Sequence, residues 1–341
     1  MSPSNADEEP VPVTCREQKL SPTPFARRRR GVLLRPGGLL LGLAVAAALS
    51  ACAPEVIQVG PTREVKLPSR AIAEASDGDT VLIDPGVYSD CALVRASNIT
   101  IQGAGAGVVL TTRTCGGKAI LITHGDDITI RNLTLQRAAV PGGNGAGIRA
   151  EGVNLTVDNV RLLDNEEGIL AGDKPGSTIR VINSDFERNG TCVNPSGCAH
   201  GVYVDHIKEL DVENSRFFDQ QVAHHVKSRA QTTLVFGNRI EDGPNGTASY
   251  EIDAPNGGSV AIQGNTIEKG PQAQNWGTVI AIGEEGHILP SQGLIIRNNK
   301  FTNDNPHETV FVHNYAPYPA QLSGNVLSGK VVPLQGAGSV Q

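Results

Sequence analysis

A short alternating run of apolar and polar positions recurs along the chain from about residue 98 almost to the C-terminus. Each unit usually ends in Asn or Ser followed by a large apolar residue, as in Val235-Phe236-Gly237-Asn238-Arg239-Ile240. The closing apolar residues lie 23 to 34 residues apart and are Leu135, Leu162, Phe186, Phe217, Ile240, Ile267, Phe301 and Leu327. A repeat of this period predicts a stack of similar structural units.

The units predict strands and not helices. Each holds runs of about 3–5 residues with period-two alternation, separated by Gly, Asn and Asp, and the chain has 39 Gly. One coil of this length cannot bury its apolar side alone, whereas stacked coils bury it between them. We therefore expect an all-β parallel β-helix of about 9–10 coils over residues 67–330. We also expect left-handed backbone and a stacked amide ladder at Asn238, Asn265, Asn299 and Asn325.

The entry to the repeat region has its own pattern. Residues 67–75 predict a short helix with Ser69 as the N-cap, and residues 78–88 predict an opening strand and turn. Together with the repeat, this entry resembles the right-handed parallel β-helix superfamily, the pectate-lyase-like folds. The resemblance covers roughly residues 60–330 and implies a helix that caps the first coil.

The first 52 residues are a different kind of sequence. The basic run Arg27 to Arg30 precedes an apolar stretch at 37–48, which indicates a secretory signal peptide. Leu49-Ser50-Ala51-Cys52 is similar to a bacterial lipobox, which implies a lipid anchor on Cys52, and Ala53 then implies an outer-membrane lipoprotein in the periplasm or on the cell surface. Cleavage without lipidation is the alternative. Residues 53–66 would be a tether and residues 331–341 a loose C-terminal tail.

Cysteine usage agrees with export. Cys91 and Cys115 are 24 residues apart, about one coil, and Cys192 and Cys198 bracket a small loop. Two disulfides are expected in an oxidising compartment. A metal site is the rival interpretation, although no CxxC spacing occurs in the sequence.

The charge balance limits the partners. The chain has 29 Lys+Arg and 35 Asp+Glu, and removing the 7 and 4 of residues 1–52 leaves 22 and 31, a net charge of −9. This argues against nucleic acid as a partner. An extended anionic polysaccharide stays open, because a local basic patch or a bound cation can reverse the local field. We expect a monomer.

Four segments spaced like coils depart from the repeat pattern, namely 200–206, 223–229, 249–253 and 280–287. Alternation places their polar residues on one outer face. The expected outward set is Tyr203, Asp205, His225, Lys227, Arg229, Glu251 and Asp253, with Glu285 at the turn. His200, Tyr250, Glu284 and His313 are further candidates for substrate binding, and Trp276 and Tyr315 could stack on sugar rings. A solvated face with ion pairs between coils is the alternative.

This set suits β-elimination at a uronic acid, which needs a cation for the carboxylate, a base for the C5 proton and an acid for the leaving oxygen. Lys227, Arg229, His225 and Tyr203 can divide those roles, with Asp205 and Asp253 beside them. Val226-Lys227-Ser228 is similar to the lysine strand of the β-helix alginate and chondroitin lyases, which implies that Lys227 is the base. C5-epimerisation shares this first step.

The sequence departs from those lyases in two ways. The next coil offers Tyr250 and Asp253 where they carry an assisting Arg, and no acidic calcium ligand stands just before Lys227. No cofactor or metal ligand is therefore assigned, and Ca²⁺ is only a candidate. Two other functions compete: a glycoside hydrolase with a carboxylate pair from Asp205, Asp253, Glu284 and Glu285, and a polysaccharide-binding protein without catalysis.

Overall fold

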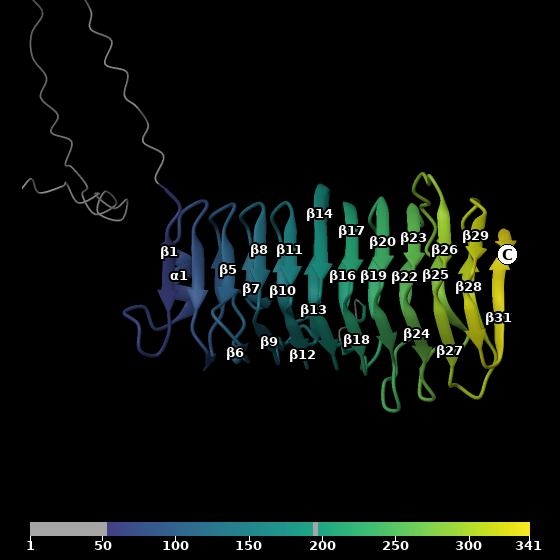
Figure 1. The fold of residues 1–341 in the computed structure, drawn as a ribbon, viewed down its shortest axis with the longest axis horizontal. Helices are drawn as coiled ribbons and strands as arrows, with labels where there is room; N and C mark the ends of the chain where they lie inside the picture. Colours follow the sequence, from purple (N-terminus) through teal and green to yellow (C-terminus); the bar gives the residue numbers. More distant parts are fainter. Residues whose placement is uncertain (1–52, 194–196) are drawn as a thin grey trace, which may run out of the picture. The chain divides into compact units, whose positions relative to one another are not determined.

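The structure is a computed structural model that describes residues 53–193 and 197–341. The signal and lipobox expectations, including Cys52, lie outside the described residues. Residues from Pro54 onward form one compact unit. In it, short strands follow one another coil by coil and build three parallel sheets (Figure 1). The prediction of an all-β parallel β-helix is confirmed.

Each complete coil contributes one strand to each sheet, in the order A, B, C, and sheet A has one additional strand at each end. Sheet A consists of β1 (Val56–Val59), β2 (Thr80–Ile83), β5 (Thr100–Gly103), β8 (Ile128–Arg131), β11 (Leu155–Asp158), β14 (Lys174–Ile182), β17 (Ile207–Glu213), β20 (Thr232–Phe236), β23 (Ser259–Gln263), β26 (Leu294–Arg297), β29 (Ala320–Ser323) and β32 (Gly338–Val340). Sheet B consists of β3 (Gly86–Tyr88), β6 (Val108–Thr111), β9 (Thr134–Gln136), β12 (Arg161–Leu163), β15 (Asp185–Glu187), β18 (Arg216–Phe218), β21 (Arg239–Glu241), β24 (Thr266–Lys269), β27 (Lys300–Asn303) and β30 (Val326–Ser328). Sheet C consists of β4 (Ala92–Val94), β7 (Ala119–Thr123), β10 (Ala146–Ala150), β13 (Glu167–Ala171), β16 (Val202–Val204), β19 (Val226–Ser228), β22 (Ile252–Ala254), β25 (Thr278–Ile282), β28 (Thr309–Asn314) and β31 (Val331–Gly336).

The core is a set of aliphatic rows that run from coil to coil. In sheet A, for example, one row starts at Val81 and Ile101 in exact register and ends at Ile296 and Leu322. Every member is 2 % exposed or less: Val81, Ile101, Ile130, Val157, Val181, Val212, Val235, Ile262, Ile296 and Leu322. Period-two alternation therefore buries one side of every strand against the coils above and below it.

A second row, of amides, fills the turn between sheets A and B. Asn265 Nδ2 donates to Asn299 Oδ1 at 2.9 Å, and Asn299 Nδ2 donates to Asn325 Oδ1 at 2.9 Å. The expected amide ladder is thus confirmed. The left-handed residues, however, are the ones directly before the ladder, such as Gly237 with φ 66° and Asn298 with φ 56°. The prediction of left-handed backbone at the ladder asparagines themselves was wrong.

The N-terminal helix is present, but its cap differs from the expectation. α1 (Pro68–Glu74) starts after Leu67, and no side chain of α1 caps it. The Ser69 N–H instead donates to Asp90 Oδ2 at 2.8 Å, so a carboxylate from the first coil supplies the acceptor. Proline at the first helical position fixes the start of the helix.

Both ends of the repeat region extend further than expected. The residues assigned to a tether include β1, which pairs in register with β2. The residues assigned to a loose tail include β31 and β32, which pair with β28 and β29. Backbone pairing with an open sheet edge makes these segments the outer coils of the solenoid.

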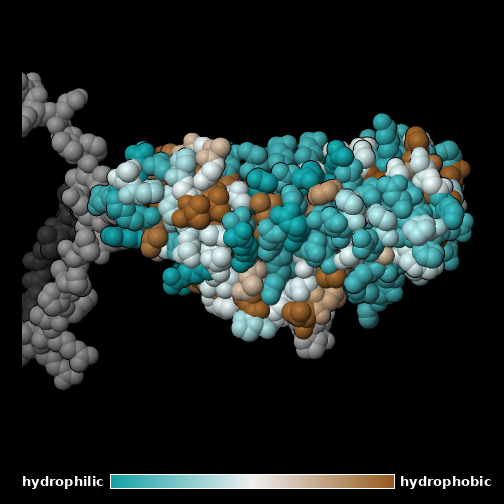
Figure 2. Space-filling model, turned by 90° about the horizontal axis from the view of Figure 1, so that it is seen from below, coloured by the Kyte–Doolittle hydropathy of each residue, from teal (hydrophilic) through white to brown (hydrophobic). Residues whose placement is uncertain are grey.

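The cysteine prediction is confirmed. Cys91 and Cys115 form a disulfide with a Cα–Cα distance of 5.5 Å, and Cys192 and Cys198 form another with 4.2 Å. The face on the side of sheet B is mainly hydrophilic, with hydrophobic residues in separate small groups (Figure 2). Within residues 53–193 and 197–341, no helix is long and apolar enough to cross a membrane.

Candidate functional site

The outer face of sheet C changes character along the stack. One outward position per coil is aligned from β4 to β28, and its occupants are Leu93, Ile122, Arg149, Leu170, Tyr203, Lys227, Asp253, Ala281 and His313. The early positions are mostly apolar, and Ile122 and Leu170 pack in a small cluster of their own. From Tyr203 onward, ionisable side chains occupy every position in this row except Ala281. The register therefore confirms that Tyr203, Lys227 and Asp253 are neighbours on one face.

Lys227 and Arg229 form the centre of this polar stretch. Lys227 Nζ lies 3.1 Å from Asp253 Oδ2 and 2.8 Å from Glu285 Oε1. Arg229 Nη1 lies 2.5 Å from Glu285 Oε2 and donates to Asn256 Oδ1 at 3.0 Å, while Arg229 Nε donates to the Tyr203 hydroxyl at 3.1 Å. We call Tyr203, Lys227, Arg229, Asp253, Asn256, Glu284 and Glu285 the sheet C cluster.

These contacts set the charge on Lys227. Burial disfavours its ammonium form, but Asp253 and Glu285 outweigh burial, and the pKa of Lys227 is raised. The side chain therefore carries a proton at neutral pH. A free amine, which the base of an elimination requires, forms only if this proton leaves. The expected role of Lys227 as a cation fits the resting structure directly, whereas its role as a base stays a prediction.

Asp253 and Glu284 bring two carboxyl groups together. Asp253 is fully buried, and both of its carboxylate oxygens and Glu284 Oε2, from the turn after β25, are buried without a hydrogen-bond partner. Burial, and next the contact with Asp253, raise the pKa of Glu284 to about 9. Glu284 is therefore protonated at neutral pH.

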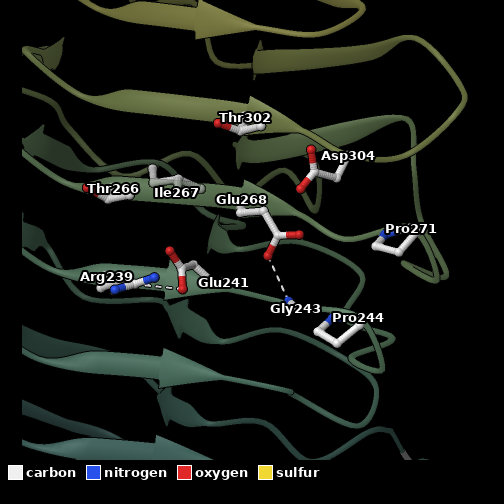
Figure 3. A pocket seen from close by; sticks show the side chains of 10 residues that line it. All are labelled: Arg239, Glu241, Gly243, Pro244, Thr266, Ile267, Glu268, Pro271, Thr302 and Asp304. Carbon is white, nitrogen blue, oxygen red and sulfur yellow. Dashed lines mark hydrogen bonds and ion pairs between the residues drawn. The ribbon is translucent and has the colours of Figure 1, made fainter.

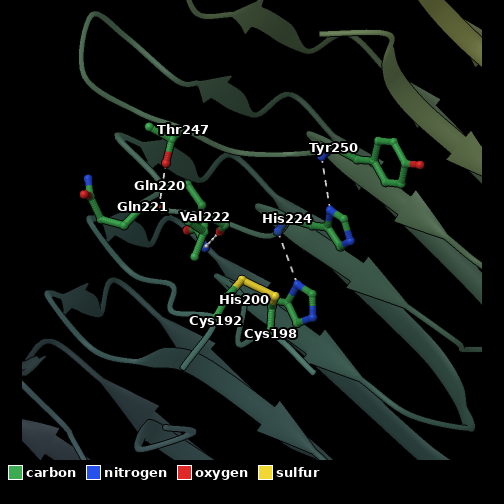
Figure 4. Close-up of a disulfide and its surroundings, with 9 residues drawn as sticks. All are labelled: Cys192, Cys198, His200, Gln220, Gln221, Val222, His224, Thr247 and Tyr250. Atoms are coloured by element: carbon green, nitrogen blue, oxygen red, sulfur yellow. Dashed lines mark hydrogen bonds between the residues drawn. A yellow bond between two sulfur atoms is a disulfide. The ribbon is translucent and has the colours of Figure 1, made fainter. Parts of the chain in front are cut away.

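A ladder of rings borders the cluster on the side where the chain enters sheet C. The rings of His200 and His224 stack at 4.9 Å, and those of His224 and Tyr250 stack at 4.8 Å. The amide of His224 donates to His200 Nδ1 at 3.2 Å, and the amide of Tyr250 donates to His224 Nδ1 at 3.1 Å (Figure 4). The Cys192–Cys198 disulfide lies beside His200 in the same view.

Burial and these hydrogen bonds fix the protonation state and the tautomer of both histidines. Burial lowers the pKa of His200 to about 3 and lowers the pKa of His224 well below its usual value, so both rings are neutral. Because Nδ1 accepts a backbone hydrogen bond in each, the ring proton is on Nε2. His224 Nε2 lies 3.4 Å from Asp253 Oδ2. His224 is therefore a neutral ring that points its Nε2 at Asp253, and its Nδ1 is already occupied by a backbone amide.

Two residues expected on the outer face are inside the solenoid instead. His225 and Glu251 are both fully buried. His225 Nε2 lies 3.1 Å from Asp242 Oδ1, and Glu251 Oε2 accepts from Lys269 Nζ at 2.7 Å. Strict alternation fails here because the chain is turning from sheet B into sheet C. The two side chains instead bind partners inside the solenoid, Asp242 after β21 and Lys269 on β24. The predicted catalytic role of His225 and the predicted substrate contact of Glu251 are contradicted by this burial.

The remaining candidates lie around the cluster. Asp205 pairs with His206, whose Nδ1 is 2.8 Å from Asp205 Oδ1. Trp276 stacks on His307 at 4.6 Å between ring centroids, and Tyr315 stacks on His313 at 3.8 Å. Trp276 and Tyr315 are each about half exposed, so both retain a free aromatic surface. Their contact with a sugar stays a prediction.

Sequence reasoning missed His224, Asn256 and the buried pair of Asp242 and Lys269. His224 stands one position before the strand, where period-two alternation no longer applies. Asn256 follows β22 and reaches Arg229 only because two coils are stacked. A histidine at the same coil position in two successive units, His200 and His224, was the available signal.

A concave region over sheet B has the wrong chemistry for an anionic polymer. A hollow of about 490 Å³ lies over sheet B and is lined by carboxylates from successive coils, Glu241, Glu268 and Asp304 (Figure 3). Burial raises the pKa of Glu268 to about 7. In the part of the chain that the structure describes, no group of three or more His, Cys, Asp or Glu side chains is arranged to hold a metal ion. Calcium therefore has no assigned ligands.

Comparison with known proteins fixes the family. The model of the right-handed β-helix region matches residues 86–267, more than half of the chain. The protein belongs to the right-handed β-helix family. Among solved structures, it resembles Escherichia coli YbhC (16 % identity, 71 % of this chain and 77 % of that one, TM-score 0.45). It also resembles pectate lyase Pel9A (15 % identity, 85 % and 78 %, TM-score 0.45).

A third similar structure is the pectin methylesterase of Yersinia enterocolitica (10 % identity, 78 % of this chain and 80 % of that one, TM-score 0.28). No curated protein matches the chain significantly in sequence. At these identities the structural likeness concerns the fold alone. The function of this β-helix protein has to be argued from its own cluster.

Proposed function

We propose that this β-helix protein acts on an extended polysaccharide that carries uronate carboxylates, by β-elimination or by C5-epimerisation. The observation that carries the proposal is the convergence of Lys227 and Arg229 on one carboxylate position at the outer face of sheet C. Their side chains are only 11 % and 18 % exposed, so water screens their charges poorly. Parallel coils offer repeated subsites along the stack, which suits an extended polymer.

The chemistry makes specific use of two cations. In elimination, the C5–H bond breaks, a C4=C5 double bond forms, and the C4–O bond breaks with its electron pair on the leaving oxygen. Negative charge develops on the uronate carboxylate when the C5 proton leaves, and Arg229 would neutralise it, together with Lys227 once Lys227 has taken that proton. Hydrolysis of the same bond has no such requirement. In epimerisation, a second group on the opposite face would donate a proton to C5.

Proton transfers are assigned to groups at the surface of the cluster. Lys227, after it releases its proton, takes the C5 proton. Tyr203 gives a proton to the leaving oxygen: burial raises the pKa of its hydroxyl, so the hydroxyl holds its proton at neutral pH, and the Arg229 guanidinium beside it stabilises the phenolate that forms.

Hydrolysis is the second candidate, and one observation favours it. Glu284 is a carboxylic acid at neutral pH, which is the form that the general acid in glycoside hydrolysis needs. In that case Glu284 would protonate the leaving oxygen, and Lys227 and Arg229 would only bind the uronate.

The first experiment mixes residues 53–341 with alginate, pectate, hyaluronan or a related polymer, with and without Ca²⁺. It follows absorbance near 235 nm, where an unsaturated uronate absorbs. Elimination predicts a rise with one polymer that Lys227→Ala abolishes and that the control Lys208→Ala, an exposed residue of β17, retains. A rise that persists in Lys227→Ala would exclude Lys227 as the base. New reducing ends without absorbance would instead indicate hydrolysis, and proton exchange at C5 without cleavage would indicate epimerisation.

We further propose that the protein is exported and anchored in the cell envelope through Cys52. The support is the basic run, the apolar stretch and the Leu49-Ser50-Ala51-Cys52 sequence. A full-length protein expressed in a Gram-negative host should incorporate labelled palmitate, and Cys52→Ser should not. Equal labelling of the two proteins would refute lipidation at Cys52.

A further inference from the structure

Glu285 holds the two cations of the sheet C cluster at once. Its Oε1 lies 2.8 Å from Lys227 Nζ, and its Oε2 lies 2.5 Å from Arg229 Nη1. The two contacts hold the Glu285 carboxylate ionised, and its pKa is lowered although partial burial acts in the other direction. One carboxylate with its two oxygens on two different cations is the arrangement in which a sugar carboxylate would bind.

Both cations have other partners that belong to the solenoid wall. Lys227 contacts Asp253, which is fixed on β22, and Arg229 contacts the Tyr203 hydroxyl and Asn256. If Glu285 turned away, these contacts would still hold Lys227 and Arg229 in place. The cluster would then lack one negative charge, since Glu284 is protonated and Asp253 alone would face two cations. An incoming anion would restore the balance.

The side chain of Glu285 can move away from the two cations while its backbone stays in place. The Glu285 amide donates to Pro255 O at 3.1 Å, and Asn256 Nδ2 donates to Gly286 O at 2.8 Å, so the turn is anchored. The side chain is 38 % exposed, far more than those of the two cations that it contacts. A change of rotamer toward solvent therefore opens the position, and no coil has to move.

We propose that Glu285 occupies the subsite of the sugar carboxylate in the resting protein and that a uronate displaces it on binding. The proposal rests on the proposed function and adds a determinant of specificity. A uronate replaces both ion pairs that Glu285 gives up. A neutral sugar leaves two poorly solvated cations without a counter-ion, so Glu285 stays in place and neutral polysaccharides are excluded.

The test measures binding of single sugars and needs no knowledge of the polymer. Titration calorimetry or ligand-observed NMR would compare D-glucuronate, D-galacturonate, D-mannuronate and neutral D-glucose on residues 53–341. Glu285→Gln keeps the shape of the side chain and removes its charge. We expect it to bind at least one uronate about tenfold or more tighter than the unchanged protein, with no gain for glucose. Glu64→Gln, the same charge change at an exposed residue before α1, should change nothing.

A second variant tests whether the gain arises at the two cations. The double variant Glu285→Gln/Arg229→Gln should lose the added affinity, because one of the two cations is gone. Glu285→Ala tests whether the gain in affinity comes from the glutamine amide itself. It should also bind a uronate more tightly than the unchanged protein. Unchanged or weaker binding in both single variants, or a gain that survives in the double variant, would overturn the proposal. If the single variants gain affinity but no polymer is turned over, the binding site stands and the catalytic proposal fails.

Discussion

Two glutamates that are neighbours in sequence have opposite protonation states in this protein. Burial, and then Asp253, raise the pKa of Glu284 to about 9. The pKa of Glu285 is lowered, because its bonds to Arg229 and Lys227 outweigh its partial burial. The two residues are of the same type and adjacent in the chain, so the difference comes mainly from how deeply each is buried and which charged groups on other coils it meets. At this site, the contacts that a side chain makes determine its protonation state, and the residue type alone does not.

These shifts predict a pH profile that separates the two reaction classes. If Lys227 is the base, it must lose its proton, and its pKa is raised, so the rate of product formation should increase steadily with pH into the alkaline range. If Glu284 is the acid of a hydrolysis, activity should be present at neutral pH and lost as pH rises through about 9. Initial rates between pH 5 and 10.5 would decide between them.

The same measurement on Glu284→Gln supplies the control. Elimination through Lys227 should keep its alkaline rise in this variant, since Glu284 has no part in the reaction. A large loss of neutral-pH activity in Glu284→Gln would instead assign the acid role to Glu284. Circular dichroism across the same pH range should show that neither protein unfolds.

At the scale of single elements, the strands of this solenoid are too short to be stable alone. Most have three to five residues, and each gains its partners only from the coil before and the coil after. The amide ladder works in the same way across the turns. Asn265 Nδ2 bonds to Asn299 Oδ1 and to Val235 O, and its Oδ1 accepts from the Asn238 amide. Turns as well as strands are therefore stabilised between coils.

Replacement of Asn265 by alanine should be costly for this reason. The change would leave the buried Val235 carbonyl and Asn238 amide without these partners, at roughly 1–3 kcal/mol for each unsatisfied group. We expect the free energy of unfolding to fall by about 2–4 kcal/mol, read from urea denaturation followed by circular dichroism. Asn325→Ala, at the more exposed end of the ladder, should cost less. An equal or larger effect at Asn325 would contradict a ladder that is strongest in its buried middle.

At the scale of the whole molecule, the fold could be read from the sequence to a large extent. The spacing of closing apolar residues such as Leu162 and Phe217 reflects the path length of one coil, and alternation inside each strand reflects which side is buried. Both are local properties. The aligned rows of Val, Ile and Leu in sheet A confirm them. The pairing of Cys91 with Cys115 followed from the same coil length.

The predictions that failed did so at places where the chain leaves a strand. Alternation placed Lys227 and Asp253 on the outer face, because both lie within strands of sheet C. It misplaced His225 and Glu251, which stand at the turn into that sheet, where Asp242 and Lys269 offer buried partners. The outermost segments were misjudged for a related reason. They lie outside the repeat that the spacing of closing apolar residues defines, and pairing with the neighbouring coils makes β1, β31 and β32 strands.

The sequence by itself therefore determined the coil, the parallel stack, the amide ladder, the disulfides and the region of the chain that carries the polar cluster. Those features depend on period and residue type within about one coil. Only the tertiary structure decided which charges meet: that Lys227 and Arg229 share Glu285, that Lys227 lies against the buried Asp253, and that His224 is held neutral. These contacts join residues from different coils, and their protonation states depend on burial and neighbouring charge, which no local pattern of residues encodes.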